Sequence, residues 1–166
     1  RIHLINIAKV AIPLKNLILM RNVDDKIDLL KSSGSCVFCD LTQGDFKGSD
    51  LNNVELRYAT LIGANLSNTN LNGANLHHTN LSGANLDGTI LTYANLAGAN
   101  LDGVDLSNKD LTGTNLSGVD LSNKDLTGTI LTHSNLSGVN LDGVDLSNKD
   151  LTGTNLSGVD LSNKDL

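Results

Sequence analysis

The sequence predicts an elongated solenoid with a narrow interior, and three observations support this prediction. Leucine occupies every fifth position from Leu41 to Leu166, with Phe46 as the single exception, which makes 26 five-residue units without an insertion. Residues 101–126 recur unchanged at 141–166. The 166 residues include only two Phe, two Tyr and no Trp, although large aromatic side chains normally dominate a globular core. A repetitive fold with a thin core agrees with all three observations.

A period of five does not fit either regular secondary structure. An α-helix turns about 100° per residue, so leucines five apart would spiral around it without forming a stripe. In a flat strand, the same spacing would place successive leucines on opposite faces. A backbone that turns one corner per unit directs every leucine to a common interior.

The other positions of each unit agree with this arrangement. Most units have a small or β-branched residue two positions before the leucine, and Asn or Asp directly before it. Two positions after the leucine most units have Gly or Asn, as at Gly73, Gly103 and Asn108. Gly and Asn tolerate the positive φ that tight turns often need. Each unit is therefore expected to contain two inward-facing side chains and one turn.

These residues resemble the pentapeptide-repeat family, whose pattern is A(D/N)LXX, most closely in GANLSNTNLNGANLHHTNLSGANL at residues 63–86. The resemblance implies an all-β solenoid, a right-handed quadrilateral β-helix with four units per coil. Residues 39–166 would form about six and a half coils, stacked about 4.8 Å apart. The duplicated block is offset by forty residues, which equals two coils, so the copy re-enters the stack in register.

Residues 1–38 are expected to form an N-terminal cap that is partly helical. The segment 24–32 predicts a short helix that begins with Asp24 as its capping residue and ends at Gly34. Its apolar residues Ile27, Leu29 and Leu30 could cover the first coil, whose strand edges would otherwise stay unpaired.

Residues 2–20 are rich in apolar residues, but Lys9, Pro13 and Lys15 interrupt them, so no membrane span is expected. No small-x-small cleavage site follows, and we expect no intact signal peptide. The chain begins with Arg and ends within the pattern, which indicates a fragment or a processed chain. We favour a cytoplasmic location, with export from a bacterium as the alternative. The C-terminal coil has no visible cap and could pair with another copy as a homodimer.

Positions twenty residues apart should stack as ladders. One ladder should contain Asn75, Asn95, Asn115, Asn135 and Asn155, and another should contain Asp105, Asp125, Asp145 and Asp165. Carboxylates about 5 Å apart repel one another, so we expect each Asp to accept hydrogen bonds from its own turn. A cation site on this acidic ladder is the alternative.

Four lysines depart from the pattern because they occupy the position of the small inward residue. They are Lys109, Lys124, Lys149 and Lys164. A buried ammonium without a partner is costly. We therefore expect their aliphatic stems to leave through the wall and their amines to pair with Asp.

A possible partner-binding surface consists of Ile90, Tyr93, Ile130 and His133. The two isoleucines replace the usual Asn or Asp and should face outward on one side, two coils apart. Tyr93 and His133 replace the turn glycine nearby. Exposed apolar residues on a polar wall can mark a contact site; the alternative is tolerated surface residues that were copied by duplication.

Cys36 and Cys39 form a lone C-x-x-C pair. Packed thiols are the simplest interpretation, and a disulfide, which would favour export, is the alternative. Zinc would need two further ligands, and His77 and His78 would lie two coils away. We therefore predict no metal site.

The sequence shows no nucleophile–base pair, no phosphate-binding loop and no isolated pair of carboxylates, so we predict a non-enzymatic protein without a cofactor. The net charge of −6 disfavours nucleic acid as a partner. The leading hypothesis is a structural scaffold for protein–protein interaction with an unidentified protein partner. The resemblance suggests an alternative, a DNA mimic that binds DNA gyrase or topoisomerase, as the acidic dimeric quinolone-resistance members do. A secreted bacterial effector or surface spacer is a third hypothesis.

Overall fold

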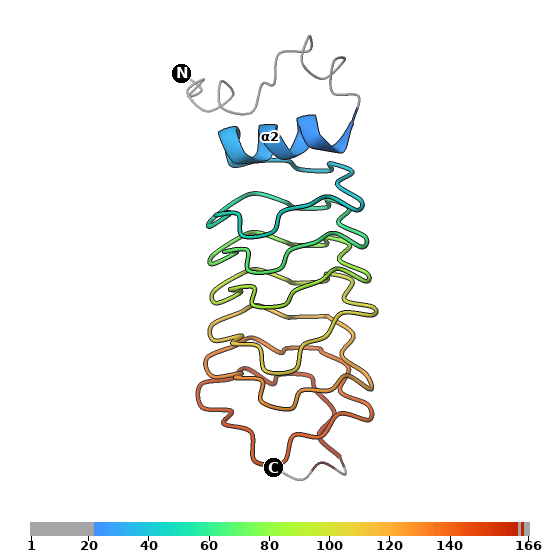
Figure 1. Ribbon diagram of the computed structural model, residues 1–166. Coiled ribbons are helices and arrows are strands. Elements are labelled where there is room, and N and C mark those ends of the chain that lie inside the picture. The colour runs from blue at the N-terminus through green and yellow to red at the C-terminus, as the bar shows by residue number, and fades with distance from the viewer. Residues whose placement is uncertain (1–21, 163, 165–166) are drawn as a thin grey trace, which may run out of the picture.

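The computed structural model describes residues 22–162 and Lys164. Helix α2 (Val23–Ser33) lies across one end of a column of stacked coils (Figure 1). Most of the predicted cap falls on residues 1–21, which lie outside the described residues. Asp165 of the acidic ladder also lies outside them, as do Asn163 and Leu166 of the C-terminal coil.

Parallel bridges join residues twenty positions apart, and the first of them joins Ser35 to Glu55. Each bridge involves a single residue per coil, and no longer strand forms in the described part of the chain. Leu96 donates its amide hydrogen to the Asn115 carbonyl at 2.7 Å, and Asn115 donates to the Ala94 carbonyl at 2.9 Å. The twenty-residue coil of four units is confirmed, and it begins four residues before the expected position 39.

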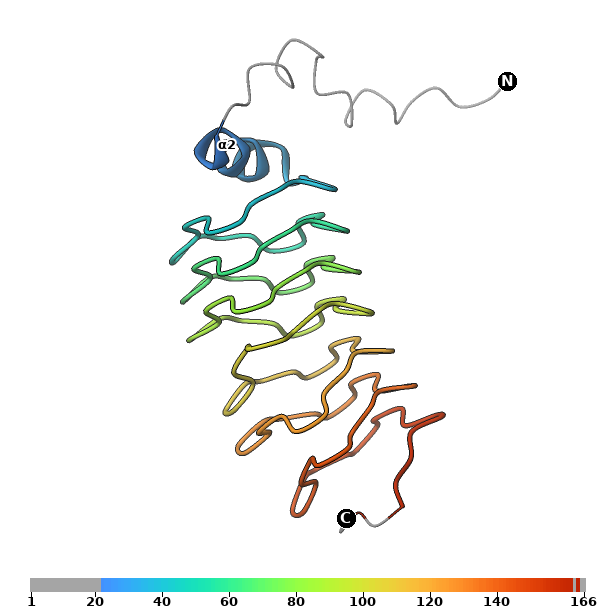
Figure 2. The same cartoon turned by 90° about the vertical axis from the view of Figure 1, so that its right-hand side faces the viewer.

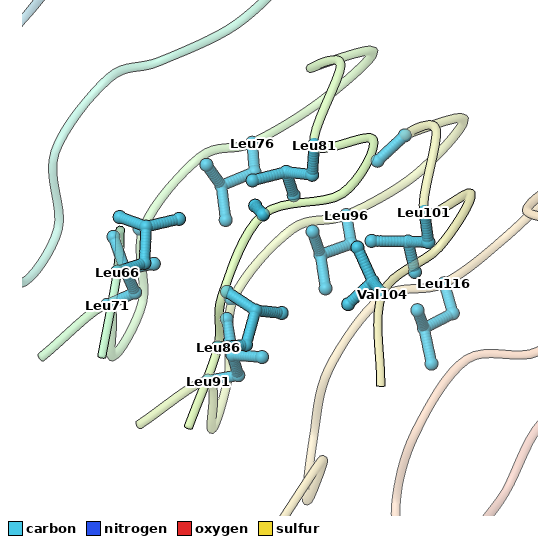
Figure 3. Packing of buried hydrophobic residues seen from close by; sticks show 14 of the residues in the cluster. Leu66, Leu71, Leu76, Leu81, Leu86, Leu91, Leu96, Leu101, Val104 and Leu116 are labelled. Atoms are coloured by element: carbon cyan, nitrogen blue, oxygen red, sulfur yellow. The ribbon is translucent and has the colours of Figure 1, made fainter. Parts of the chain in front are cut away.

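The centre residues of the units form the core. Figure 3 shows leucines from successive turns, such as Leu66, Leu76 and Leu96, directed into a common interior, and these three are fully buried. Cys36 takes the centre position of the first unit and is also buried. Because a cysteine occupies this first centre position, the run of centre leucines begins at Leu41, one unit after the repeat itself begins.

Each unit closes with a turn at which the backbone adopts positive φ. The turn residue is often glycine, such as Gly113 with φ +67°, but Tyr93 and His133 adopt the same conformation with φ +61° and +58°. The amide of the next residue returns to the centre carbonyl, as Ala64 does to Leu61 at 3.0 Å. These turns produce the corner that the five-residue period predicts.

Helix α2 begins one residue earlier than expected. Asn22 is the capping residue, and its side chain accepts a hydrogen bond from the Asp25 amide at 2.9 Å. The expectation that Asp24 caps the helix was wrong, because Asp24 lies in the first turn, where its charge favours the helix dipole. Gly34 ends the helix as predicted, with φ +71°. Ile27 and Leu30 of α2 are buried in the same cluster as the coil leucines, and Leu29 packs against it.

Inward hydroxyls connect neighbouring coils. The Thr114 hydroxyl donates to the Leu91 carbonyl at 3.0 Å, across a separation of 23 residues. Thr69, Thr79, Thr89, Thr129 and Thr154 make the same contact to a centre carbonyl of the preceding coil. These buried polar groups therefore have partners, as buried hydroxyls require.

Three of the four inward lysines, all except Lys109, correct the expectation that their amines pair with Asp by donating to backbone carbonyls instead. Lys149 and Lys164 donate to the Leu126 and Leu141 carbonyls, also 23 residues away. Lys124 donates to the Val104 carbonyl at 3.1 Å. Within the described ranges, the one ion pair closer than 4.0 Å joins Arg57 to Glu55. The flexible stems turn along the wall, so the half-buried amines reach backbone carbonyls before they reach a carboxylate.

The lysine-bearing half of the rod is bridged unevenly. On one side, bridges continue without a gap from Ser35 to Asn155. On the opposite side, none joins Asn85, Asp105, Asp125 and Asp145 to one another, although all four are described. The Val104 carbonyl, which lacks the expected amide donor from Asp125, accepts instead from Lys124. Figure 2 shows the result: one side of the rod keeps an even coil spacing while the opposite side opens toward the C-terminal end.

Candidate protein-interaction surfaces

The continuously bridged side, which we call the Asn wall, stacks Asn75, Asn95, Asn115, Asn135 and Asn155. From Asn95 onward, each side-chain amide donates to the side-chain oxygen of the Asn in the preceding coil, as Asn115 does to Asn95 at 3.1 Å. The Asn75 amide donates to the Glu55 carboxylate at 3.0 Å. Each side-chain oxygen also accepts from a backbone amide two residues later, such as that of Ser117 at 3.1 Å. The predicted amide ladder is confirmed, and its hydrogen bonds hold this wall in register.

The Asn wall carries no charged residue from Leu91 onward. Its flanking corner positions are Thr92, Thr112, Thr132 and Thr152 on one edge, and Ala97, Ser117, Ser137 and Ser157 on the other. The Thr112 and Thr132 hydroxyls are 3.3 Å apart and form a row along the rod. In the same half of the protein, the aspartates and lysines occupy the other three sides. An acidic rod therefore has one neutral, regular side.

The predicted surface of Ile90, Tyr93, Ile130 and His133, which we call the Ile patch, adjoins the Asn wall. Ile90 pairs with Asn70 and Ile130 pairs with Asp110, which places the isoleucines in one stacked column. Ile90 is 49% exposed, Ile130 47% and Tyr93 65%. His133 is exposed on the same corner as Tyr93. The structure brings the four side chains to one edge of the rod, and their role in binding stays a prediction.

Large turn side chains lie over a glycine of the following coil. A methyl group added to Gly113 would clash with the Tyr93 ring, and one added to Gly153 would clash with His133. Gln43, Asn53, Asn68, His78, Asn108 and Asn123 cover glycines in the same way. At these eight turns, the residue twenty positions after the large side chain is a glycine.

The described members of the acidic ladder, Asp105, Asp125 and Asp145, are exposed and accept hydrogen bonds from their own turns. Asp105 accepts from the Ser107 amide at 2.8 Å, and the other two accept equivalent bonds from Thr127 and Ser147. Hydrogen bonds from these turn residues lower the pKa of each carboxyl below its ordinary value of 3.8, with the larger effect from the hydroxyl group and the smaller from the backbone amide. The predicted role as turn acceptors is confirmed for these three residues.

Crevices open where bridges are absent. One of them, about 970 Å³, lies between residues 123–132 and 143–150. Its lining includes Lys124, Asp125, Asp145, Lys149 and Asp150 but no His or Cys. Among residues 22–162 and Lys164, no three His, Cys, Asp or Glu side chains come together as a metal site would require.

A disulfide joins Cys36 and Cys39, whose Cα atoms are 5.4 Å apart. This differs from the packed thiols that we favoured. Cys36 is buried at a centre position, and Cys39 is half-buried at the next inward position. Both side chains therefore point to the interior of the first coil, which brings the sulfur atoms together.

An aromatic cluster at the N-terminal end was not predicted. The Phe38 and Tyr58 rings stack with centroids 4.9 Å apart, and Tyr58 stacks on His78 at 5.4 Å. These three residues, which we call the aromatic ladder, occupy turn positions twenty residues apart. Phe38 is 73% exposed and Tyr58 44%. The spacing of 38, 58 and 78 was the available signal, but Phe38 precedes the position at which the repeat was expected to start.

No helix in the described part of the chain is long and apolar enough to cross a membrane.

Comparison with known proteins identifies the repeat. The family model for pentapeptide repeats matches eight copies over residues 35–73, 69–108 and 110–148. A trypsin-treated form of QnrB1, a plasmid-mediated fluoroquinolone resistance protein, is 27% identical with a TM-score of 0.63; the alignment covers 74% of this chain and 57% of that chain. HetL, a pentapeptide repeat protein involved in heterocyst differentiation regulation from the cyanobacterium Nostoc sp. strain PCC 7120, is 29% identical with a TM-score of 0.42, over 78% of this chain and 62% of that chain.

A pentapeptide repeat protein from the Arabidopsis thaliana thylakoid lumen is 25% identical with a TM-score of 0.37, over 80% of this chain and 69% of that chain. No curated protein sequence matches the chain significantly. The family model covers well over half of the residues, and the bridges and turns of the structure follow the same five-residue units. The chain belongs to the pentapeptide-repeat family.

Proposed function

We propose that the protein is a non-enzymatic scaffold that binds a protein partner through the Ile patch and the adjoining Asn wall. The observation that carries this proposal is the pair of half-exposed isoleucines, Ile90 and Ile130, in one column beside a neutral wall. Covering apolar surface contributes about 25 cal/mol per Å² of area removed from water. The exposed isoleucine and tyrosine side chains would supply this contribution at the centre of a contact.

The charge distribution supports a partner with a largely uncharged contact surface. A partner on the Asn wall meets hydroxyls and amides, which exchange hydrogen bonds without the desolvation of a charge. Asp110 lies between the two isoleucines and is the charged residue of this column that such a partner would meet. The continuous bridges keep the wall rigid, so a partner need not order it on binding.

Site-specific photo-cross-linking in the native host tests the proposal. A photoreactive residue at Tyr93 should capture a partner, whereas one at Asn108, a turn residue of matching backbone conformation on a charged side, should not. The substitutions Ile90→Asp and Ile130→Asp should abolish the cross-link at position 93. The matched control is Asn100→Asp with Asn140→Asp, which adds the same charges two coils apart on another side. Equal capture at both positions, or equal loss in the control, would exclude a contact at the Ile patch.

A second candidate function is mimicry of DNA toward DNA gyrase or topoisomerase. It is supported by the similarity to QnrB1, by the net charge of −6 and by the exposed column of Asp105, Asp125 and Asp145. Their lowered pKa values favour the ionised state at neutral pH. The inward lysines in the same half dilute this negative charge.

Inhibition of purified gyrase distinguishes the two candidates. If the protein is a DNA mimic, it inhibits supercoiling, and the Asp→Asn substitutions at 105, 125 and 145 weaken that inhibition. If it is a side-wall scaffold, these substitutions leave partner capture at Tyr93 unchanged. A secreted effector or surface spacer stays the third proposal. The disulfide supports it because such bonds persist mainly outside the reducing cytosol.

A further inference from the structure

We propose that the N-terminal segment of this chain, residues 2–20, docks on the aromatic ladder of Phe38, Tyr58 and His78. Phe38 is the most exposed of the large hydrophobic side chains, and its ring continues into Tyr58 and His78 as one stacked stripe. This corner holds two of the four Phe and Tyr residues of the chain.

The stripe is fixed in place by the backbone. Phe38 and Tyr58 donate their amide hydrogens to the Arg57 and His77 carbonyls of the following coil, both at 3.0 Å. His78 continues the column, with Nδ1 3.3 Å from the Gly98 carbonyl. The aromatic ladder therefore presents a preformed apolar edge rather than loose side chains.

The segment is attached at the same end of the rod as the ladder. It joins α2 at Asn22, and α2 contacts the first coil through Lys26, whose amine donates to the Asp40 carbonyl at 2.9 Å. Twenty extended residues reach about 70 Å, and the ladder spans two coil steps of about 4.8 Å each. The length of chain preceding Asn22 is therefore sufficient to reach every ring.

The composition of the segment complements the surface. Residues 2–20 include thirteen Ala, Val, Ile, Leu or Met residues, listed as Ile2, Leu4, Ile5, Ile7, Ala8, Val10, Ala11, Ile12, Leu14, Leu17, Ile18, Leu19 and Met20. Residues 1–21 contain four basic residues and no acidic one, giving +4, whereas residues 22–166 carry −10, which together give the total of −6. Exposed Asp24, Asp28 and Asp40 lie at the end of the rod that the segment joins. Opposite charges favour docking within one chain.

Trypsin cleavage of the full chain at Lys9 and Lys15 tests the proposal, with the fragments identified by mass spectrometry. The test variant carries Phe38→Asn and Tyr58→Asn, since Asn occupies this turn position with positive φ elsewhere, as at Asn68. Releasing the segment should speed cleavage at both lysines about tenfold. Tyr93→Asn, which removes an exposed ring from another corner, should leave the cleavage rate unchanged. Urea unfolding of each variant checks that the rod stays folded.

Nuclear Overhauser contacts in the unmodified protein give a second readout that does not depend on any variant. Methyl groups of residues 2–20 should contact the Phe38 and Tyr58 rings within one chain. Cleavage at Lys9 and Lys15 as fast as in the free 1–21 peptide, with no such contacts, would overturn the proposal. Contacts that form only between differently labelled chains would show a second copy as the occupant. Protection that arises only with vesicles containing anionic lipid would show a membrane surface instead, and either result would also overturn the proposal.

Discussion

Replacing Gly113 with Ala is expected to destabilise the rod more than the same replacement at Gly83. Both glycines occupy the turn position, with φ +67° and +64°. A methyl group at Gly83 would meet nothing within 4 Å, whereas one at Gly113 would clash with the Tyr93 ring. The pair therefore separates the cost of the backbone conformation from the cost of displacing the side chain above it.

The two costs differ in size and origin. A non-glycine residue in the left-handed region costs about 1–2 kcal/mol, which is the whole effect expected for Gly83→Ala. Pushing the Tyr93 side chain off its rotamer adds about 0.5–1.5 kcal/mol at Gly113. Substituting Tyr93 with Gly removes the side chain that the Gly113→Ala methyl group would meet, and glycine adopts the positive φ of this turn without strain. In that background, Gly113→Ala should cost no more than Gly83→Ala does.

Urea unfolding measures the free energy of unfolding of Gly83→Ala, Gly113→Ala, Tyr93→Gly and the double variant Tyr93→Gly/Gly113→Ala, with one common dependence on urea concentration. Together with the unmodified protein, the last three form a double-mutant cycle. We expect a coupling free energy of about 0.5–1.5 kcal/mol between positions 93 and 113. Equal losses for Gly113→Ala and Gly83→Ala, or no relief from Tyr93→Gly, would refute the argument that turn side chains rest on glycines of the following coil.

Three further predictions concern the core, the lysines and the acidic ladder. Leu96→Ala should lower the free energy of unfolding by about 3–5 kcal/mol because Leu96 is fully buried. Leu156→Ala, at a half-buried centre residue, should cost less, and similar losses would contradict a core that is packed more loosely toward the C-terminal end. Lys149→Thr should place a hydroxyl at the Leu126 carbonyl, as Thr129 does at the Leu106 carbonyl. The neighbouring coils should then lie closer together, and hydrogen exchange of the Asp150 amide should slow. An unchanged exchange rate would argue against lysine as the cause of the open coils. The carboxyls of Asp105, Asp125 and Asp145 have pKa values below 3.8 in the folded protein, so their stabilisation is present above that value and is lost as the pH falls through the lowered pKa values. Substituting all three with Asn keeps the turn acceptor and should flatten the acid side of the pH–stability profile, and a profile identical to that of the unmodified protein would contradict this assignment.

The core and the turns were predictable because the five-residue period admits few geometries. Once one corner per unit is assumed, the leucines, the residues before them and the turn residues each acquire a fixed direction. The stacking of Asn95, Asn115 and Asn135 follows from four units per coil without knowledge of any contact. The local sequence and the global fold favour the same arrangement at these positions, so the five-residue pattern is sufficient to predict the direction of each side chain.

The lysine contacts could not be predicted from the pattern. The sequence places Lys124 and Lys149 at inward positions, and the cost of burying an ammonium implies that each needs a partner. Which partner each one finds depends on which carbonyls lack an amide donor. That depends on how far neighbouring coils separate, a cooperative property of the stack that no single unit encodes.

The N-terminal features were obscured by departures from the consensus. Cys36 fills a centre position normally held by Leu, so the first unit was not recognised and Phe38 was not assigned to a turn. With the first unit included, the positions of Phe38, Tyr58 and His78 coincide at one corner. The bond between Cys36 and Cys39 stayed one of several alternatives, because a C-x-x-C spacing alone does not fix the direction of either side chain.

Scalar couplings transmitted through backbone hydrogen bonds test the four-unit coil most directly. The account predicts coupling between the Leu96 amide nitrogen and the Asn115 carbonyl carbon, and between the Leu116 amide nitrogen and the Asn135 carbonyl carbon, since these donor–acceptor pairs lie 2.7 and 2.8 Å apart. Couplings at any other regular separation along the sequence, or none between these pairs in the folded protein, would contradict a backbone that closes one square turn every twenty residues.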